Sequence, residues 1–133
     1  MNHLQYLVDT DWVISYQHSV PRVVSRLNAL LAQGVGLSIV SLAELYEGEQ
    51  YSADPQAEAQ GLREFLSAVP VVHLDDDICR IFARERARLR AEGNLIGDLD
   101  LLIGSTALRH GLTLLSNNRR HSERLRGLNV ISV

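Results

Sequence analysis

Three acidic residues far apart in the chain, Asp9, Glu44 and Asp100, each lie next to an apolar segment. Carboxylates gathered in one place repel each other by about 4 kcal/mol per pair at ~4 Å and an effective dielectric near 20, so a cluster needs a cation to stay ionised. Hard carboxylate and amide oxygens select Mg²⁺ or Mn²⁺ over zinc. One or two such ions can generate hydroxide from bound water and stabilise a leaving oxygen. The chemistry that these residues suggest is metal-assisted hydrolysis of an RNA phosphodiester.

Asp9 is followed two residues later by a second aspartate, Asp11. In an extended segment both side chains point to the same side, which would make Asp11 a second ligand. Alternatively, Asp11 caps the helix that carries Trp12 and Val13, because aspartate accepts hydrogen bonds from the first N–H groups of a helix. We favour the cap for Asp11 and the site for Asp9.

The other two acidic candidates also have structural alternatives. Ser41 precedes Glu44 by three residues, which is the spacing of a capping box at a helix start, so Glu44 is either a cap or a ligand. Asp98 directly follows Gly97, which suits a helix cap. Asp100 is then the residue that faces the site.

The remaining ionisable residues narrow the chemistry. The sequence has five histidines at no short ligand spacing, namely His3, His18, His73, His110 and His121. A zinc site is therefore disfavoured. All 13 basic residues are arginine, which excludes mechanisms that need a lysine. The net charge of -3 gives no global attraction to nucleic acid.

The acidic run 75–77 is assigned to a helix start, where it complements the helix dipole.

Short apolar runs alternate with helical patterns along the chain. The predicted strands are 4–8, 37–40, 71–74, 112–116 and 128–132. Helices are predicted around Trp12, over 21–33, from Ser41, from Asp54, over 75–92, from Asp98 and, briefly, after Asn118. Strands separated by such helices are joined by parallel βαβ crossovers. We therefore expect an α/β fold: one domain over 1–133, a parallel-sheet α/β/α sandwich with about five short strands and helices on both faces.

This architecture predicts where the polar residues meet. In an open α/β sheet, sites lie beyond the carboxyl ends of the strands. Asp9 follows the first predicted strand, Glu44 the second, and Ser116 with Asn118 the fourth, while Asp100 begins a helix that can point to the same edge. The sequence shows no basic leader and no apolar run of membrane-spanning length, so we expect a cytoplasmic protein without membrane contact.

Several stretches resemble the PIN-domain ribonucleases, and most closely the VapC-type toxins of bacterial toxin–antitoxin pairs. They are residues 6–12, 38–45, 96–108 and 110–118, followed by Glu123-Arg-Leu and Gly127-Leu. Each motif is short, but their order and spacing match over essentially the whole chain.

The resemblance implies Asp9, Glu44 and Asp100 as acidic metal ligands and Asn118 as a fourth site position, with Ser116 as a polar neighbour. It also implies dependence on Mg²⁺ or Mn²⁺, a structured RNA substrate such as tRNA or rRNA, a homodimer, and a cognate VapB-type antitoxin that blocks the site. The fold that it implies is PIN-like.

Two features depart from the pattern of these toxins. Asp11 stands where they usually have Asn, and His121-Ser122 replaces an acidic-aromatic pair. The second departure affects the corner of the site near Asn118.

Two arginine clusters offer local contacts for phosphate. They are Arg80, Arg84 and Arg88, and Arg119, Arg120, Arg124 and Arg126. For the first cluster we favour a solvated helix face whose arginines pair with Glu85 and Glu92. For the second we favour contact with RNA.

Two other functions fit parts of the sequence. Asp9, Asp11 and Val13 match the pattern of haloacid-dehalogenase-like phosphatases, in which the first aspartate is the nucleophile. Those enzymes also use a basic residue, usually lysine, which this chain lacks. The second alternative is a non-catalytic PIN-like binding module, which would need no acidic triad.

Overall fold

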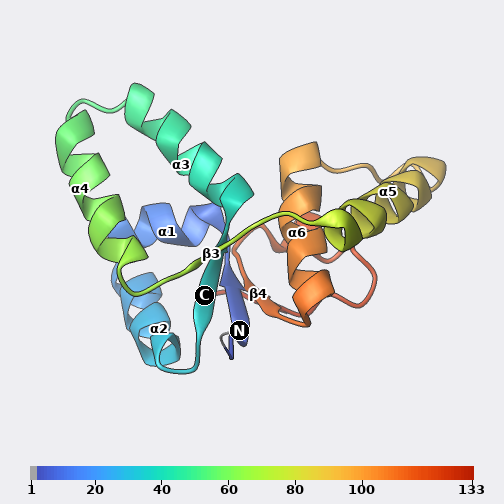
Figure 1. The fold of residues 1–133 in the computed structure, drawn as a ribbon, viewed down its shortest axis with the longest axis horizontal. Helices are drawn as coiled ribbons and strands as arrows, with labels where there is room; N and C mark the ends of the chain where they lie inside the picture. Colours follow the sequence, from blue (N-terminus) through green and yellow to red (C-terminus); the bar gives the residue numbers. More distant parts are fainter. Residues whose placement is uncertain (1–2) are drawn as a thin grey trace.

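The computed structural model describes residues 3–133 and contains a five-stranded sheet in the order β3-β2-β1-β4-β5 (Figure 1). The strands are β1 (Tyr6–Val8), β2 (Val35–Ser38), β3 (Val71–Val72), β4 (Thr113–Leu115) and β5 (Val130–Ile131). All four strand pairs are parallel. The chain leaves the central strand β1 on one side toward β2 and returns on the other side as β4. In open α/β sheets, sites form where the chain changes in this way from one side of a central strand to the other. The predicted α/β class, with a parallel sheet of five short strands, is confirmed.

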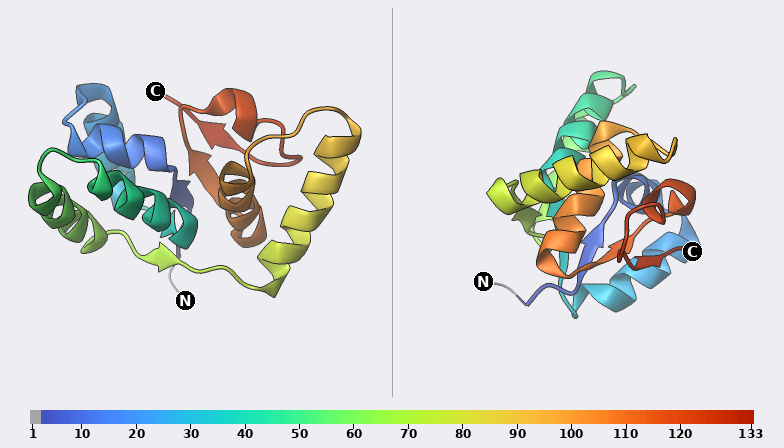
Figure 2. Two further views of the ribbon diagram at one scale, coloured as in Figure 1. Left: turned by 90° about the horizontal axis from the view of Figure 1, so that it is seen from above. Right: turned by 90° about the vertical axis from the view of Figure 1, so that its right-hand side faces the viewer.

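Helices cover both faces of the sheet. They are α1 (Thr10–Gln17), α2 (Pro21–Leu31), α3 (Ile39–Gln50), α4 (Pro55–Leu66), α5 (Asp76–Ala91), α6 (Asp98–His110) and α7 (Arg119–Ser122). Helices α3 and α4 lie on one side of the sheet, and α5 and α6 lie on the other, as Figures 1 and 2 both show. Within residues 3–133, no helix is long and apolar enough to cross a membrane.

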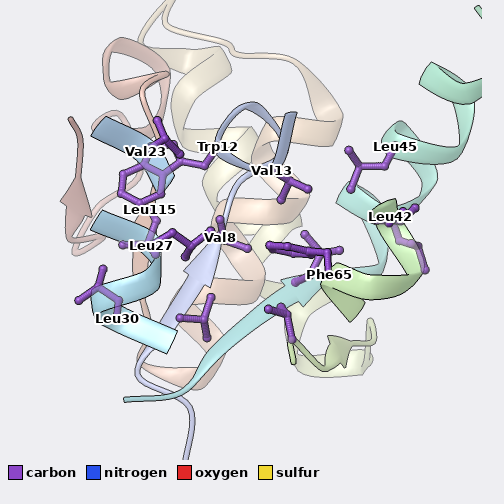
Figure 3. Packing of buried hydrophobic residues seen from close by; sticks show 14 residues of the cluster. Val8, Trp12, Val13, Val23, Leu27, Leu30, Leu42, Leu45, Phe65 and Leu115 are labelled. Atoms are coloured by element: carbon purple, nitrogen blue, oxygen red, sulfur yellow. The ribbon is translucent and has the colours of Figure 1, made fainter. Parts of the chain in front are cut away.

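Alternate residues of the strands pack on opposite faces. Val8 of β1 and Leu115 of β4 belong to a core with Trp12 and apolar residues of α1 to α4 (Figure 3). Leu7 and Leu114, one position earlier in each strand, pack instead against α6. Each fully buried aliphatic side chain contributes roughly 1.5–3 kcal/mol to folding. This two-sided burial holds the carboxyl ends of β1 and β4 side by side.

Helix α5 packs against α6 and projects away from the sheet (Figure 2). Its N-cap is Asp75, which accepts the Ile78 N–H at 2.8 Å, so the assignment of the acidic run to a helix start is confirmed. Arg88 pairs with Glu85, as predicted. However, Glu85 is only 5% exposed and also accepts the Arg126 N–H at 2.9 Å. The expectation of a solvated pair was therefore wrong at Glu85.

Helix α3 begins earlier than the sequence suggested. Ser38 is its N-cap and accepts the Val40 N–H at 3.0 Å. Ser41 therefore lies inside the helix, and the predicted capping box with Glu44 is wrong. The apolar run 37–40, which predicts a strand, is divided between β2 and α3, because Ser38 can end the strand and cap the helix.

Two other predicted caps also differ. Asp9, rather than Asp11, is the N-cap of α1. The N-cap of α6 is Gly97, without a side-chain hydrogen bond, and Asp98 instead forms an ion pair with Arg86 at 2.9 Å. Aspartate is a good cap, but which aspartate occupies that position depends on where the strand or loop before it ends.

Candidate active site

One pocket of about 280 Å³ gathers acidic side chains from separate parts of the chain. It is lined by Asp9, Thr10, Asp11, Ile14, Glu44, Asp100 and Asn118. The four candidate site residues therefore line the same pocket, at the carboxyl end of β1 and the N-terminal ends of α6 and α7. This is the edge of the sheet at which the sequence predicted that they would meet.

Asp9 is the most enclosed carboxylate of the pocket, with 6% of the residue exposed. Its Oδ1 accepts the Thr10 N–H at 2.8 Å and its Oδ2 accepts the Ser116 hydroxyl at 2.6 Å. Burial, together with the charges of Asp11 and Asp100, raises the pKa of Asp9 to about 6 in spite of these hydrogen bonds. A cation in the pocket would offset both causes of this shift.

Glu44 lies in the second turn of α3 and faces α1. Its Oε1 accepts a hydrogen bond from the Thr10 hydroxyl at 2.7 Å. Because the backbone N–H of Thr10 also binds Asp9, one residue orients two of the candidate carboxylates. The Glu44 side chain is therefore hydrogen-bonded toward the pocket and does not cap its own helix.

Asp100 is the third residue of α6. Its Oδ2 accepts a hydrogen bond from Asn118 Nδ2 at 3.3 Å and lies 3.8 Å from His121 Nδ1. Asp98, two residues earlier, is paired with Arg86 and does not line the pocket. The structure thus separates the two aspartates in the way that the sequence predicted, although Asp98 does not act as a cap.

Asp11 also lines the pocket. Its Oδ2 accepts the backbone N–H of Asn117 at 2.9 Å, while its Oδ1 is buried and has no hydrogen-bond partner within residues 3–133. Burial and the nearby charge of Asp100 raise the pKa of Asp11. Asn117 is not among the site residues that the sequence predicts, and its position between Ser116 and Asn118 is the only feature of the sequence that points to it.

The donor set of the pocket suits a hard divalent cation. All the carboxylate and amide ligands that it offers are oxygens, which favour Mg²⁺ or Mn²⁺. In the part of the chain from 3 to 133, however, no three His, Cys, Asp or Glu side chains are grouped as a complete metal-binding set. Mg²⁺ usually retains several waters and binds one or two carboxylates, so an open acidic pocket fits its chemistry.

Arginines near Asn118 have partners within the protein. Arg119 donates to the Val130 carbonyl at 2.9 Å, and Arg124 donates to the carbonyls of Asn94 and Leu95 at 3.2 and 3.3 Å. These two side chains therefore have structural roles in addition to any contact with RNA.

Comparison with known proteins identifies the family. The PIN domain profile matches residues 6–126. The chain is 33% identical over 126 residues to "Ribonuclease VapC2" of Haemophilus influenzae, covering 92% of each chain. It is 30% identical over 127 residues to "tRNA(fMet)-specific endonuclease VapC" of Shigella flexneri, covering 94% of this chain and 95% of the relative. Among solved structures, VapBC2 of Rickettsia felis bound to a promoter DNA fragment superimposes with a TM-score of 0.91 at 25% identity, covering 98% and 99% of the two chains.

Proposed function

This chain belongs to the PIN domain family and, within it, to the VapC-type ribonucleases, and from this premise we propose that it cuts RNA as the toxin of a toxin–antitoxin pair. The observation that carries the proposal is the pocket that brings together Asp9, Glu44, Asp100 and Asn118 from four separate elements. The pKa of Asp9 is raised first by burial and then by the charges of Asp11 and Asp100, which supports a cation-dependent site.

We assign Asp9, Glu44 and Asp100 as ligands of Mg²⁺ or Mn²⁺, and Asn118 as the fourth polar residue of the site. When bound, such an ion supplies a hydroxide nucleophile at neutral pH and stabilises charge on the phosphate and the leaving oxygen. Endonucleolytic hydrolysis of an RNA phosphodiester is the reaction that this chemistry and the family together support.

The residues around the ligands position them. Ser116 and Thr10 bind the two oxygens of Asp9, so its carboxylate has a single orientation. Thr10 also binds Glu44, and Asn118 binds Asp100. Hydrogen bonds of this kind, made to metal ligands by their neighbours, raise the affinity and activity of metal sites about 10- to 100-fold.

The relatives suggest the substrate and partners. One of them is named as an endonuclease specific for tRNA(fMet), which favours a structured RNA, tRNA or rRNA, as the substrate here. Several similar structures are VapBC complexes, which favours a VapB-type antitoxin as the partner. We further propose that the protein acts in the cytoplasm as a homodimer.

The activity can be tested on purified protein with tRNA, rRNA and a generic phosphate monoester. Each substrate is incubated with Mg²⁺, Mn²⁺ or EDTA, for the wild type and for Asp9→Asn, Glu44→Gln and Asp100→Asn. We expect metal-dependent RNA cleavage by the wild type and none above background by the three variants. Glu47→Gln is the matched control, because Glu47 is an exposed glutamate of the same helix as Glu44 and does not line the pocket.

Other outcomes would contradict the proposal. Monoester hydrolysis without RNA cleavage would favour the haloacid-dehalogenase-like alternative, in which Asp9 is the nucleophile and Asp11 the acid/base. RNA binding without cleavage in any metal would favour a non-catalytic binding module. RNA cleavage that persists in EDTA and in all three variants would show that Asp9, Glu44 and Asp100 do not form the active site.

A further inference from the structure

Three consecutive residues after β4 each donate a hydrogen bond to a different acidic residue of the pocket. The pairs are Ser116 with Asp9 at 2.6 Å, Asn117 with Asp11 at 2.9 Å, and Asn118 with Asp100 at 3.3 Å. Because Asp9 and Asp11 lie at the start of α1 and Asp100 lies in the first turn of α6, the tripeptide 116–118 is the common neighbour of both carboxylate-bearing segments. Its placement therefore controls how far apart these carboxylates lie.

The tripeptide is itself held by residues 130–133, which we call the 130–133 segment. The Ser116 N–H donates to the Ile131 carbonyl at 3.0 Å, and the Ser132 hydroxyl donates to the Ser116 carbonyl at 2.6 Å. The Val133 N–H donates to Asn117 Oδ1 at 3.0 Å. Hydrogen bonds on the backbone and on a side chain thus connect this segment to the tripeptide.

Asn117 is the residue at which these contacts meet. Its Oδ1 accepts the indole N–H of Trp12 at 3.1 Å in addition to the Val133 N–H. Trp12 is fully buried, and a buried indole N–H needs an acceptor. One amide oxygen therefore links α1, the tripeptide and the 130–133 segment, while the backbone N–H of the same residue binds Asp11.

We propose that Asn117 is a positioning residue of the nuclease site. It does not line the acidic pocket, so it acts through the segments that it connects. With the Asn117 side-chain oxygen removed, the tripeptide loses its contacts with the Trp12 indole and with the Val133 N–H. The contacts of Ser116 with Asp9 and Ser132 remain, so the tripeptide stays attached, but its position, and with it the spacing of the carboxylates of α1 and α6, is held less firmly. This inference rests on the proposed function, because it concerns the geometry of the same metal-binding pocket.

The test compares Asn117→Ala with Asn117→Asp in the full chain. Mn²⁺ affinity is measured by calorimetry, and RNA cleavage is resolved into kcat and KM. For Asn117→Ala we expect Mn²⁺ affinity and kcat each to fall about tenfold, with KM for RNA changed less than about twofold. Asn117→Asp retains an acceptor oxygen at the same place and should recover at least the wild-type Mn²⁺ affinity.

Asn129→Ala is the matched control, because Asn129 is an exposed asparagine just before β5 whose side chain makes no hydrogen bond within residues 3–133. It should bind Mn²⁺ and cut RNA like the wild type.

A double variant separates the effect of Asn117 on the geometry of the site from its effect on the stability of the fold. Asn117→Ala leaves the buried indole N–H of Trp12 without an acceptor, which alone would lower Tm. In a Trp12→Phe background that donor and its contact with Asn117 are absent, but the contact of Asn117 with the Val133 N–H remains. The same substitution should therefore lower Tm less, and should weaken Mn²⁺ binding by less than about tenfold but by more than about twofold.

The inference is overturned if Asn117→Ala binds Mn²⁺ within about twofold of the wild type, or if its binding defect disappears in the Trp12→Phe background. Failure of the proposed function would instead be seen in the wild type, which would neither bind Mn²⁺ nor cut RNA.

Discussion

The Ser116 hydroxyl lies 2.6 Å from Asp9 Oδ2 and joins residues that are 107 positions apart in the sequence. The contact forms because β1 and β4 are neighbours in the sheet and both end at this edge, with Val8 opposite Leu115. The hydrogen bond lowers the pKa of Asp9 and thus opposes the effect of burial. Ser116 keeps a buried carboxylate oriented and closer to its charged form.

Ser116→Ala should weaken both the fold and the site. The hydroxyl also accepts the Asn118 N–H at 3.0 Å, so the substitution leaves two polar groups of a buried region without their partner. We expect a loss of about 1–3 kcal/mol in the free energy of unfolding, measured by urea denaturation. Mg²⁺ affinity should fall about 10- to 100-fold. Ser25→Ala, at an exposed serine of α2, should change neither quantity, and an unaltered Mg²⁺ affinity in Ser116→Ala would contradict the role given to this hydroxyl.

Asp9→Asn should stabilise the metal-free protein above pH 6. The pKa of Asp9 is about 6 in the folded state and about 3.9 in an unfolded chain. Between these values the folded protein binds more protons, so its stability falls as the pH rises through the window. The neutral variant avoids this loss and should be more stable by up to roughly 3 kcal/mol at pH 7.5 in EDTA.

The advantage of Asp9→Asn should shrink as the pH falls from 6 toward the unfolded pKa of about 3.9, and should disappear below that value, where Asp9 is protonated in both states. Urea titrations at several pH values measure it, and Glu47→Gln, at an exposed position, should show no such trend. Added Mg²⁺ should raise the Tm of the wild type but not of Asp9→Asn. If the difference in unfolding free energy between the wild type and Asp9→Asn does not change with pH, the pKa of Asp9 is not raised in the folded protein.

Glu85 and Glu92 both pair with Arg88, yet their removal should have unequal effects. Glu85 is buried and accepts Arg88 Nη2 at 2.8 Å, whereas the Glu92 side chain is 44% exposed. Glu85→Ala removes the main partner of Arg88 and the acceptor of the Arg126 N–H, and should cost about 1.5–3 kcal/mol. Glu92→Ala should cost less than about 1 kcal/mol. Thermal and urea unfolding compare the two, and equal losses would show that burial does not decide the strength of this network.

The pKa of Glu85 is lowered, chiefly by its hydrogen bond with Arg88. A group with a lowered folded-state pKa contributes stability above its unfolded pKa and loses that contribution as the pH falls through the folded value. The destabilisation caused by Glu85→Gln should therefore be full at neutral pH and should shrink in acid. Unfolding free energies of variant and wild type from pH 7 to pH 3 test this expectation, which would fail if the difference grew in acid.

Two glycines inside helices should respond to alanine with opposite signs. A Cβ on Gly104 of α6 would lie 2.6 Å from Cδ2 of the buried Leu125, so Gly104→Ala should cost about 1–3 kcal/mol through overpacking. A Cβ on Gly48 of α3 would meet nothing within 4 Å. Gly48→Ala should therefore raise stability by roughly 0.5–1 kcal/mol, because alanine loses less backbone entropy in a helix. Tm values of the two variants measure the signs, and a stabilising Gly104→Ala would show that Leu125 moves aside freely.

The sequence alone predicts the class of fold and the place where the polar residues meet. This is possible because apolar runs and helical spacing are read from neighbouring residues, and the rule for parallel crossovers follows from the order of the elements. Together they predict that one edge of the sheet holds Asp9, Glu44, Asp100 and Asn118. The element ends were less accurate. Predicted strands such as 4–8 and 128–132 are shorter in the structure, at Tyr6–Val8 and Val130–Ile131, because the residue pattern does not show which residues pair with a neighbouring strand.

Only the tertiary structure decides what each polar residue does at that edge. Asp11 was expected to be a cap, but its carboxylate binds the N–H of Asn117, 106 residues away. Glu85 was expected on a solvated face, but the Arg126 N–H, 41 residues away, reaches it in a buried position. Helix periodicity and capping preferences describe a residue's neighbours along the chain, whereas hydrogen-bond partners and burial depend on which distant segments the folded sheet places beside it.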